Sequence, residues 1–173
     1  MDRHNYLETQ RMILLPYKQR NAEDLFRIQS DPEVSRYTIR ANSVADAEHR
    51  YVVNESRRKQ DGFAPWVVRS KENEKVIGYG GLTIDSFDPG WGIEVMYFFA
   101  PESWGKGLAT ELVAKALSIG FDKLGLPEIA AFAKPKNKAS IRVLEKNGFE
   151  FVRYESHLER NHYFVRGSNL VNL

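Results

Sequence analysis

The sequence of 173 residues contains no cysteine. This absence excludes disulfide bonds, thiolate ligands for a metal and a cysteine nucleophile, and it fits an intracellular protein. Long apolar runs are missing too, because Met1–Gln10 is polar and no later run is long enough to span a bilayer. We therefore expect a cytoplasmic protein with no membrane partner.

Strong net charge is also lacking. The 25 Lys and Arg against 23 Asp and Glu leave a formal charge of +2, which by itself does not indicate a nucleic-acid partner. Basic residues do not gather into a run with interleaved aromatics, so a nucleic-acid-binding module has little support. The four histidines, His4, His49, His157 and His162, lack metal-ligand spacing, and we expect no metal.

No repeat, low-complexity tract or Pro/Gly/Ser-rich linker divides the chain. With 42% hydrophobic and 28% charged residues the composition is that of a folded globular protein. A chain of this length buries roughly 70% of its unfolded surface around one core. We therefore expect residues 1–173 to form a single domain.

The first half of the chain predicts a strand and then two helices. Met12–Leu15 is an apolar run closed by Pro16, which is typical of a strand. Asn21 is a candidate cap for a helix that follows it. A second helix is expected from Ser43, with an acidic residue three positions later, to Gly62.

Three strands are expected next, at Trp66–Arg69, Val76–Thr83 and Ile93–Phe99. Turn residues separate them at Lys71–Glu74 and at Asp88–Gly90. Successive strands joined by short turns predict an antiparallel meander.

A long amphipathic helix follows, because apolar residues recur at helical spacing until Gly125 and Pro127. These apolar residues are Leu108, Leu112, Ala116, Leu117, Phe121 and Leu124. Ile129–Ala133 then reads as a strand, which a right-handed crossover would place parallel to the strand before the helix.

The last part predicts a short helix and two strands. The helix covers Lys138–Lys146, and the strands lie near Phe149–Tyr154 and Tyr163–Val165. The fold class is α+β around a mixed sheet.

The segment Pro101–Thr110 joins an apolar strand to the long helix. Gly105 and Gly107 let backbone amides approach an anion closely, and the amino-terminal end of a helix favours phosphate. A tight turn is the simpler reading of a bare Gly-x-Gly. The position after a strand and before a helix favours a pyrophosphate site instead.

With these motifs the chain resembles the GNAT superfamily, in its ribosomal-protein N-terminal acetyltransferase branch. The family's loop usually begins with Gln or Arg, where this chain has Trp104. Further matches are Leu7–Arg11, Asp31–Val34, Ile77–Tyr79 and Asn137–Phe149. The resemblance implies a mostly antiparallel central sheet with two splayed parallel strands, Ile93–Phe99 and Ile129–Ala133, and flanking helices.

The resemblance also implies acetyl-coenzyme A as co-substrate. Backbone groups of Tyr97, Phe98 and Phe99 would hold its pantetheine and acetyl ends, and Asn137 would reach the pantetheine arm. The pyrophosphate would bind the loop formed by Trp104, Gly105, Lys106, Gly107, Leu108, Ala109 and Thr110. Lys106, Lys134, Lys136 and Arg142 are candidates for the remaining phosphate or are ordinary surface residues.

Glu94 is the candidate general base. Its strand is otherwise apolar, and burial raises the pKa of a carboxylate toward that of a useful base. From residue type alone, a solvent-facing edge or an ion pair with an arginine such as Arg40 is equally compatible. The family position favours the base, acting through water.

The family's usual acid is a tyrosine at the position that Leu144 takes here. Ser140, Tyr154 or water are therefore the candidates for donating to the leaving thiolate. Ser140 is equally a residue that bonds the backbone at a helix start. Trp66, Tyr37 and Tyr79 are candidates for a substrate pocket or for plain core.

The predicted activity is direct acetyl transfer in a ternary complex to a primary amine or a protein amino terminus. The alternatives are a small-molecule acetyltransferase, acting on a polyamine, amino acid or antibiotic, and a non-catalytic acyl-coenzyme A sensor. The protein is expected to be a monomer or homodimer.

Overall fold

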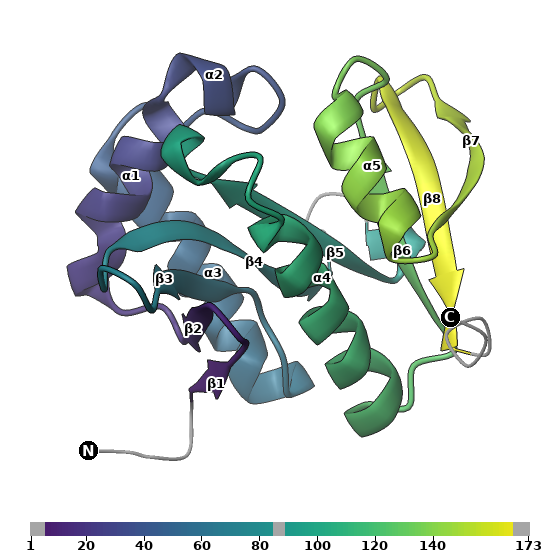
Figure 1. Cartoon of the computed structure of the whole chain (residues 1–173), viewed down its shortest axis with the longest axis horizontal. Coiled ribbons are helices and arrows are strands. Elements are labelled where there is room, and N and C mark those ends of the chain that lie inside the picture. Colours follow the sequence, from purple (N-terminus) through teal and green to yellow (C-terminus); the bar gives the residue numbers. More distant parts are fainter. Residues whose placement is uncertain (1–5, 85–88, 168–173) are drawn as a thin grey trace. The chain divides into compact units, whose positions relative to one another are not determined.

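The computed structural model describes residues 6–84 and 89–167. Backbone contacts divide the chain into two compact units (Figure 1). Unit 1 contains Met1–Gly81 and Tyr97–Leu108, and unit 2 contains Leu82–Met96 and Ala109–Leu173. Asp88 of the expected turn lies outside the described residues.

Within the described residues, eight strands form one mixed sheet in the order β1-β2-β3-β4-β5-β6-β8-β7. The predicted α+β class is confirmed, and β5 and β6 are the parallel pair in a mostly antiparallel sheet. The strands are β1 (Leu7–Glu8), β2 (Met12–Leu15), β3 (Trp66–Ser70), β4 (Val76–Ile84), β5 (Ile93–Phe99), β6 (Glu128–Ala133), β7 (Glu150–Glu155) and β8 (Arg160–Arg166).

The flanking helices are α1 (Ala22–Ser30), α2 (Pro32–Ser35), α3 (Val44–Asp61), α4 (Leu108–Ser118) and α5 (Lys138–Lys146). Short 3₁₀ turns lie at η1 (Gln19–Asn21), η2 (Pro89–Trp91) and η3 (Pro101–Ser103), and a π-helical turn, η4 (Ile119–Lys123), continues α4. Among the residues with a described structure, no helix has both the length and the apolar character needed to cross a membrane.

The core of unit 1 contains a chain of aromatic rings. Tyr17 packs on Tyr51 at 5.0 Å between ring centroids, Tyr51 on Tyr79 at 4.8 Å, and Tyr79 on Phe98 of β5 at 6.0 Å. These rings pack α3 against strands β4 and β5. Trp66 and Tyr79 are almost completely buried, so they are core residues here.

The ends of α3 follow the sequence signals. The Ser43 hydroxyl accepts a hydrogen bond from the Asp46 amide at 3.1 Å, and Gly62 ends the helix with φ of 82°. The expected cap at Asn21 is wrong, because its side chain does not cap α1 and instead accepts from the Lys18 amide at 3.0 Å. A competing local turn uses the same oxygen.

In unit 2, β5 pairs with β6 in parallel, with Glu94 opposite Ala130. The predicted parallel relation is confirmed. The last strand, β8, lies between β6 and β7 and is antiparallel to both. Figure 1 shows α5 running alongside β6 and β8.

The predicted long helix is present but changes its winding near the end. After Ser118 the π turn begins, and it contains Gly120. A Cβ at Gly120 would lie 2.5 Å from Cδ1 of Ile129, so this turn passes close to β6. Glycine therefore permits the packing at this point.

Candidate active site

Two left-handed glycines shape the loop between β5 and α4. Gly105 has φ of 73° and Gly107 has φ of 76°, a conformation that costs other residues energy. An added Cβ on Gly105 would have no heavy atom within 4 Å, so an anion can approach the backbone there. The loop leads directly into the amino-terminal turn of α4 at Leu108, where amides lack partners within the helix.

Trp104 ties this loop to the end of β5. Its indole Nε1 donates a hydrogen bond to the carbonyl oxygen of Phe99 at 2.9 Å, while the side chain stays 46% exposed. The Phe99 carbonyl is thus already engaged by protein. Ala100 donates its amide to the Ile77 carbonyl at 2.8 Å, which fixes the strand end against β4.

Arg11 contacts the same loop and was not assigned a role from the sequence. Its Nη1 donates to the carbonyl oxygen of Lys106 at 2.6 Å. Its Nη2 lies 3.5 Å from where a Cβ of Gly107 would be. No local pattern predicts this contact, because the two residues are 95 positions apart in the chain.

Asn137 and Ser140 meet at the start of α5. Asn137 is the N-cap residue, and its Oδ1 accepts a hydrogen bond from the Ser140 amide at 3.1 Å. Both side chains are half-buried. Asn137 therefore has a structural role in addition to any contact with the coenzyme.

Glu94 lies half-buried on β5, opposite Ala130. Arg40, the alternative partner named from the sequence, belongs to unit 1, whereas Glu94 belongs to unit 2. Leu144 is only 1% exposed and is part of the core. A tyrosine at this position would have to fit into that core. Tyr154 of β7 is 50% exposed.

The candidate residues belong to both units. Tyr97, Phe98, Phe99 and the loop from Trp104 to Leu108 are in unit 1, whereas Glu94, Ala109, Thr110, Asn137 and Ser140 are in unit 2. The structure brings the loop residues together and brings Asn137 and Ser140 together. Lys106, Lys136 and Arg142 are exposed, as expected for phosphate-binding or ordinary surface cations.

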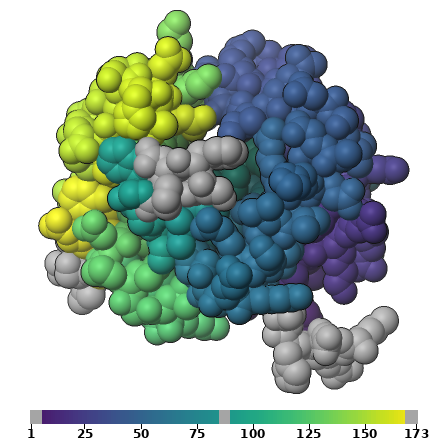
Figure 2. Space-filling view, turned by 180° about the vertical axis from the view of Figure 1, so that it is seen from behind, coloured from purple at the N-terminus to yellow at the C-terminus, as the bar shows by residue number. Residues whose placement is uncertain are grey.

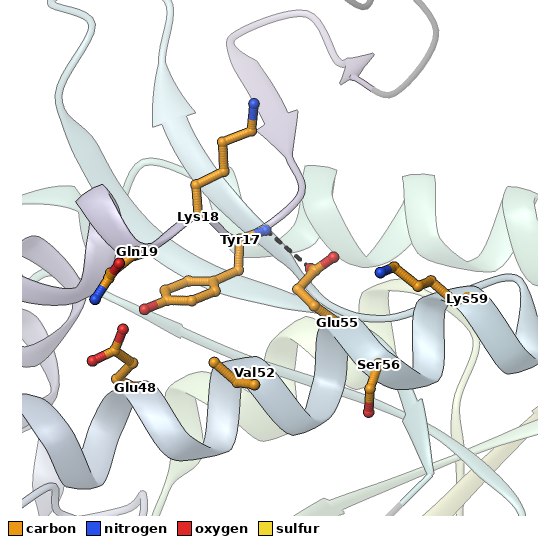
Figure 3. Close-up of a pocket in the computed structure, with 8 residues that line it drawn as sticks. All are labelled: Tyr17, Lys18, Gln19, Glu48, Val52, Glu55, Ser56 and Lys59. Carbon is orange, nitrogen blue, oxygen red and sulfur yellow. Dashed lines mark hydrogen bonds between the residues drawn. The ribbon is translucent and has the colours of Figure 1, made fainter.

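A pocket of about 420 Å³ lies in unit 1 between α3 and the segment before α1 (Figure 3). The outward face of α3 belongs to the blue surface in Figure 2. Residues lining the pocket are Tyr17, Lys18, Gln19, Glu48, Val52, Glu55, Ser56 and Lys59. The Tyr17 hydroxyl is buried with no hydrogen-bond partner in the described part of the chain.

The pocket is mixed in charge. Burial, and then the negative charge of Glu48, raise the pKa of Tyr17. Glu55 is already paired with Arg58 at 2.9 Å and accepts the Tyr17 amide at 2.9 Å. The two carboxylates are accompanied by Lys18 and Lys59, so the pocket is not an acidic one.

Unit 2 contains an aromatic cluster around His162. The ring of His162 stacks on Phe132 at 4.8 Å and meets Trp91 edge-on at 5.0 Å. Its Nδ1 lies 3.5 Å from Oε1 of Glu155 and makes no hydrogen bond to the described residues. Burial lowers the pKa of His162, and the Glu155 carboxylate partly opposes that effect.

Histidine and acidic side chains do not form a candidate metal centre within residues 6–84 and 89–167. His4 lies outside these ranges. The cluster around His162 contains one carboxylate and several aromatic rings, so its contacts are those of side chains packed in a core.

Comparison with known proteins identifies the family. Residues 11–150 match the model of the acetyltransferase (GNAT) domain. The uncharacterized N-acetyltransferase YoaA of Bacillus subtilis is 32% identical over 146 residues, covering 83% of this chain and 82% of YoaA.

Solved structures share the fold. An acetyltransferase from Agrobacterium tumefaciens superposes with a TM-score of 0.82 at 19% identity, over 93% of this chain and 94% of that one. A ribosomal-protein-S5-alanine acetyltransferase from Vibrio fischeri gives 0.77 at 17% identity, over 95% and 97%. With its mixed sheet and its glycine loop before α4, this chain belongs to the GNAT family of acetyltransferases.

Proposed function

We propose that the protein transfers an acetyl group from acetyl-coenzyme A to a primary amine or a protein amino terminus by direct attack in a ternary complex. One observation carries the proposal: Gly105 and Gly107 adopt left-handed conformations directly before α4. Exposed amides at a helix start suit a pyrophosphate.

The loop fits the coenzyme for two reasons. Gly105 leaves the backbone open to an anion, and Trp104 and Arg11 hold the loop on either side of it by hydrogen bonds. A preorganised set of amides binds an anion without an ordering cost at the moment of binding. The amides from Gly105 to Thr110 would therefore hold the pyrophosphate, and Asn137 would hold the pantetheine arm.

The coenzyme supplies an acetyl group activated as a thioester. Attack requires a neutral amine, and Glu94 would accept the proton of the attacking amine through a water molecule. Ser140 would donate a hydrogen bond to the sulfur as the carbon–sulfur bond breaks. The amine nitrogen forms the new bond to the acetyl carbon as the carbon–sulfur bond breaks, and the thiolate leaves and takes a proton from Ser140, Tyr154 or water to become a thiol.

The acceptor is proposed as an amine of the kind found at protein amino termini. The similarity in fold to the Vibrio fischeri enzyme, whose name specifies a ribosomal-protein alanine, is compatible with this acceptor. A small cationic acceptor would be favoured by an acidic pocket, and the pocket beside α3 has lysines as well as glutamates.

Coenzyme binding is tested by thermal unfolding. Coenzyme A at one hundred times its dissociation constant should add about 2.7 kcal/mol, which for a domain of this size is roughly 5 to 11 °C. Gly107→Asp should abolish the shift, because it puts a side chain and a negative charge at the loop. Gly125→Asp is the matched control, since Gly125 has φ of 63° and its added Cβ would meet nothing within 4 Å.

The acceptor is tested with a panel of peptides and small amines, with release of the coenzyme thiol as the readout. Turnover with peptides that carry a free amino terminus supports the proposal. Turnover confined to polyamines, amino acids or aminoglycosides would assign a small-molecule acceptor instead. Coenzyme binding without turnover of any amine would identify a sensor.

A further inference from the structure

Arg11 is held in place by a compact turn between β1 and β2. The Thr9 amide donates to the Met12 carbonyl at 3.0 Å, and the Met12 amide donates to the Thr9 hydroxyl at 3.1 Å. The Arg11 carbonyl accepts from the Lys71 amide at 3.0 Å. The backbone that carries the Arg11 side chain is therefore fixed on both sides.

From this fixed base the Arg11 side chain reaches the glycine loop. Its Nη1 donates to the Lys106 carbonyl at 2.6 Å, a charge-assisted hydrogen bond of the stronger kind. Arg11, Lys106 and Gly107 all belong to unit 1. The contact between Arg11 and the loop therefore lies within unit 1.

The contact sets the direction of one peptide group. In a planar trans peptide the carbonyl and the following N–H point in opposite directions. Because the Lys106 carbonyl points to Arg11, the Gly107 amide points away from it. Gly105 and Gly107 have few steric limits on their backbone angles. Without the bond from Arg11, the Lys106–Gly107 peptide can therefore rotate to another orientation.

We propose that Arg11 is a positioning residue that fixes the Lys106–Gly107 peptide, so that the Gly107 amide is presented to the diphosphate of the coenzyme. This inference rests on the proposed function, because it assigns the loop to the coenzyme diphosphate. Arg11 acts through the loop backbone, and its role is distinct from that of a cation placed against the phosphate.

The distinction has a chemical consequence. A planar guanidinium on a long stem can hold a carbonyl in one orientation, whereas an ammonium is a compact point charge. A charge effect survives replacement of Arg11 by lysine and weakens with added salt. A positioning effect is largely lost with lysine and is the same at low and high salt.

The experiment measures the dissociation constant of coenzyme A by calorimetry, at low and at high salt, for wild type, Arg11→Ala and Arg11→Lys. Arg27→Ala is the control, because Arg27 is an exposed unit 1 arginine that pairs with Asp24 on the same helix, at 3.2 Å. We expect about tenfold weaker binding for both Arg11 variants, the effect of losing one such bond. Arg27→Ala should bind as wild type does.

A second measurement isolates the diphosphate. Turnover of acetylpantetheine, which lacks the diphosphate, should be equal in wild type and Arg11→Ala, whereas the KM for acetyl-coenzyme A rises and kcat is kept. If Arg11→Ala does not fold, Arg11→Met, which keeps an apolar stem but has no donor for the Lys106 carbonyl, replaces it in both measurements.

The outcomes separate the two proposals. Wild type that does not bind coenzyme A overturns the proposed function itself. Wild type that binds while Arg11→Ala binds equally well overturns only the role of Arg11. If the weaker coenzyme binding disappears in Arg11→Lys or at high salt, Arg11 acts through its charge. If Arg11→Ala loses as much turnover with acetylpantetheine as with acetyl-coenzyme A, the substitution damages the protein generally. Either result overturns the proposal that Arg11 positions the loop peptide.

Discussion

The side-chain oxygen of Asn137 accepts a hydrogen bond from the Ser140 amide, 3.1 Å away. This bond caps α5 and uses the carbonyl end of the Asn137 side chain. The amide end, Nδ2, is the donor that the proposed contact with the pantetheine arm requires. The two ends of one side chain can therefore be tested separately.

Asn137→Asp should keep the cap and lose the donor, because aspartate is also a good cap. We expect unchanged thermal stability and a KM for acetyl-coenzyme A raised about three- to tenfold, the loss of one hydrogen bond. Asn137→Ala should show the same rise and also lose about 1 kcal/mol of stability. An unchanged KM in both variants would leave Asn137 with the capping role alone.

Gly78→Ala should destabilise unit 1. A Cβ on Gly78 would lie 2.5 Å from the Phe98 carbonyl oxygen and 2.9 Å from Cδ1 of Phe99. The first contact is with backbone and cannot relax by a rotamer change, so we expect a loss of about 1 to 3 kcal/mol. Urea unfolding measures it, and a stability equal to that of wild type would mean that β4 and β5 move apart at little cost.

Much of this fold could be predicted because its signals are local. Residues such as Ser43 and Gly62 mark helix ends through their own chemistry, and Ile93–Phe99 has the predicted bounds of β5. The two-residue β1 and the four-residue α2 were missed, because segments this short carry no periodicity.

The order of strands is a different matter. Insertion of β8 between β6 and β7 depends on pairing between distant segments, which no local pattern specifies. The same reason hides the Arg11 contact with Lys106. The loop glycines, in contrast, could be predicted, because a strand, two glycines and a helix in succession define the local geometry.

The stability of unit 2 should depend on pH through His162. Burial lowers its pKa, as does the charge of Arg153, while Glu155 and Glu128 act in the opposite sense. Above the ordinary histidine pKa of about 6.5 the ring is neutral in both the folded and the unfolded chain, so protonation of His162 costs no stability. Below that pH the unfolded chain takes up the proton first, so stability falls until the lower folded pKa is passed.

His162→Phe should remove this acid-side loss, because phenylalanine keeps the stacking on Phe132 and does not titrate. The free energy of unfolding, measured with urea from pH 5 to 7, should vary less with pH than in wild type. His49→Gln, at an exposed position on α3, is the control and should keep the wild-type slope. An equal slope in His162→Phe would assign the pH dependence to other groups.

Glu94→Gln should bind coenzyme A normally and lower kcat by about a hundredfold or more, the usual contribution of a positioned base. The amide keeps the shape of the side chain without its basicity. The defect should shrink at high pH, where more of the amine is already neutral in solution. Glu128→Gln, on the neighbouring strand with its side chain 58% exposed, should be as active as wild type, and a pH-independent loss in Glu94→Gln would indicate a binding role.

The leaving thiolate needs a proton, and the burial of each candidate position decides which side chain can supply it. Leu144 is 1% exposed, so introducing the family's tyrosine there should cost about 1 to 3 kcal/mol through overpacking. Leu144→Tyr is therefore expected to lower the stability of the protein and not to restore the family's acid. Ser140, half-buried at the start of α5, is the candidate that fits without repacking.

Ser140→Ala should slow thiol release about tenfold, since one hydrogen bond worth about 1.4 kcal/mol is lost in the transition state. The loss is modest because the thiol of coenzyme A resembles that of cysteine, whose pKa is about 8.5, so its thiolate is a tolerable leaving group and needs only a weak acid. Tyr154→Phe is the matched test, because it removes only the hydroxyl of the other candidate. Each variant is first shown to bind coenzyme A as wild type does. If Ser140→Ala is as fast as wild type and Tyr154→Phe is slow, the proton comes from β7; if both are fast, water supplies it.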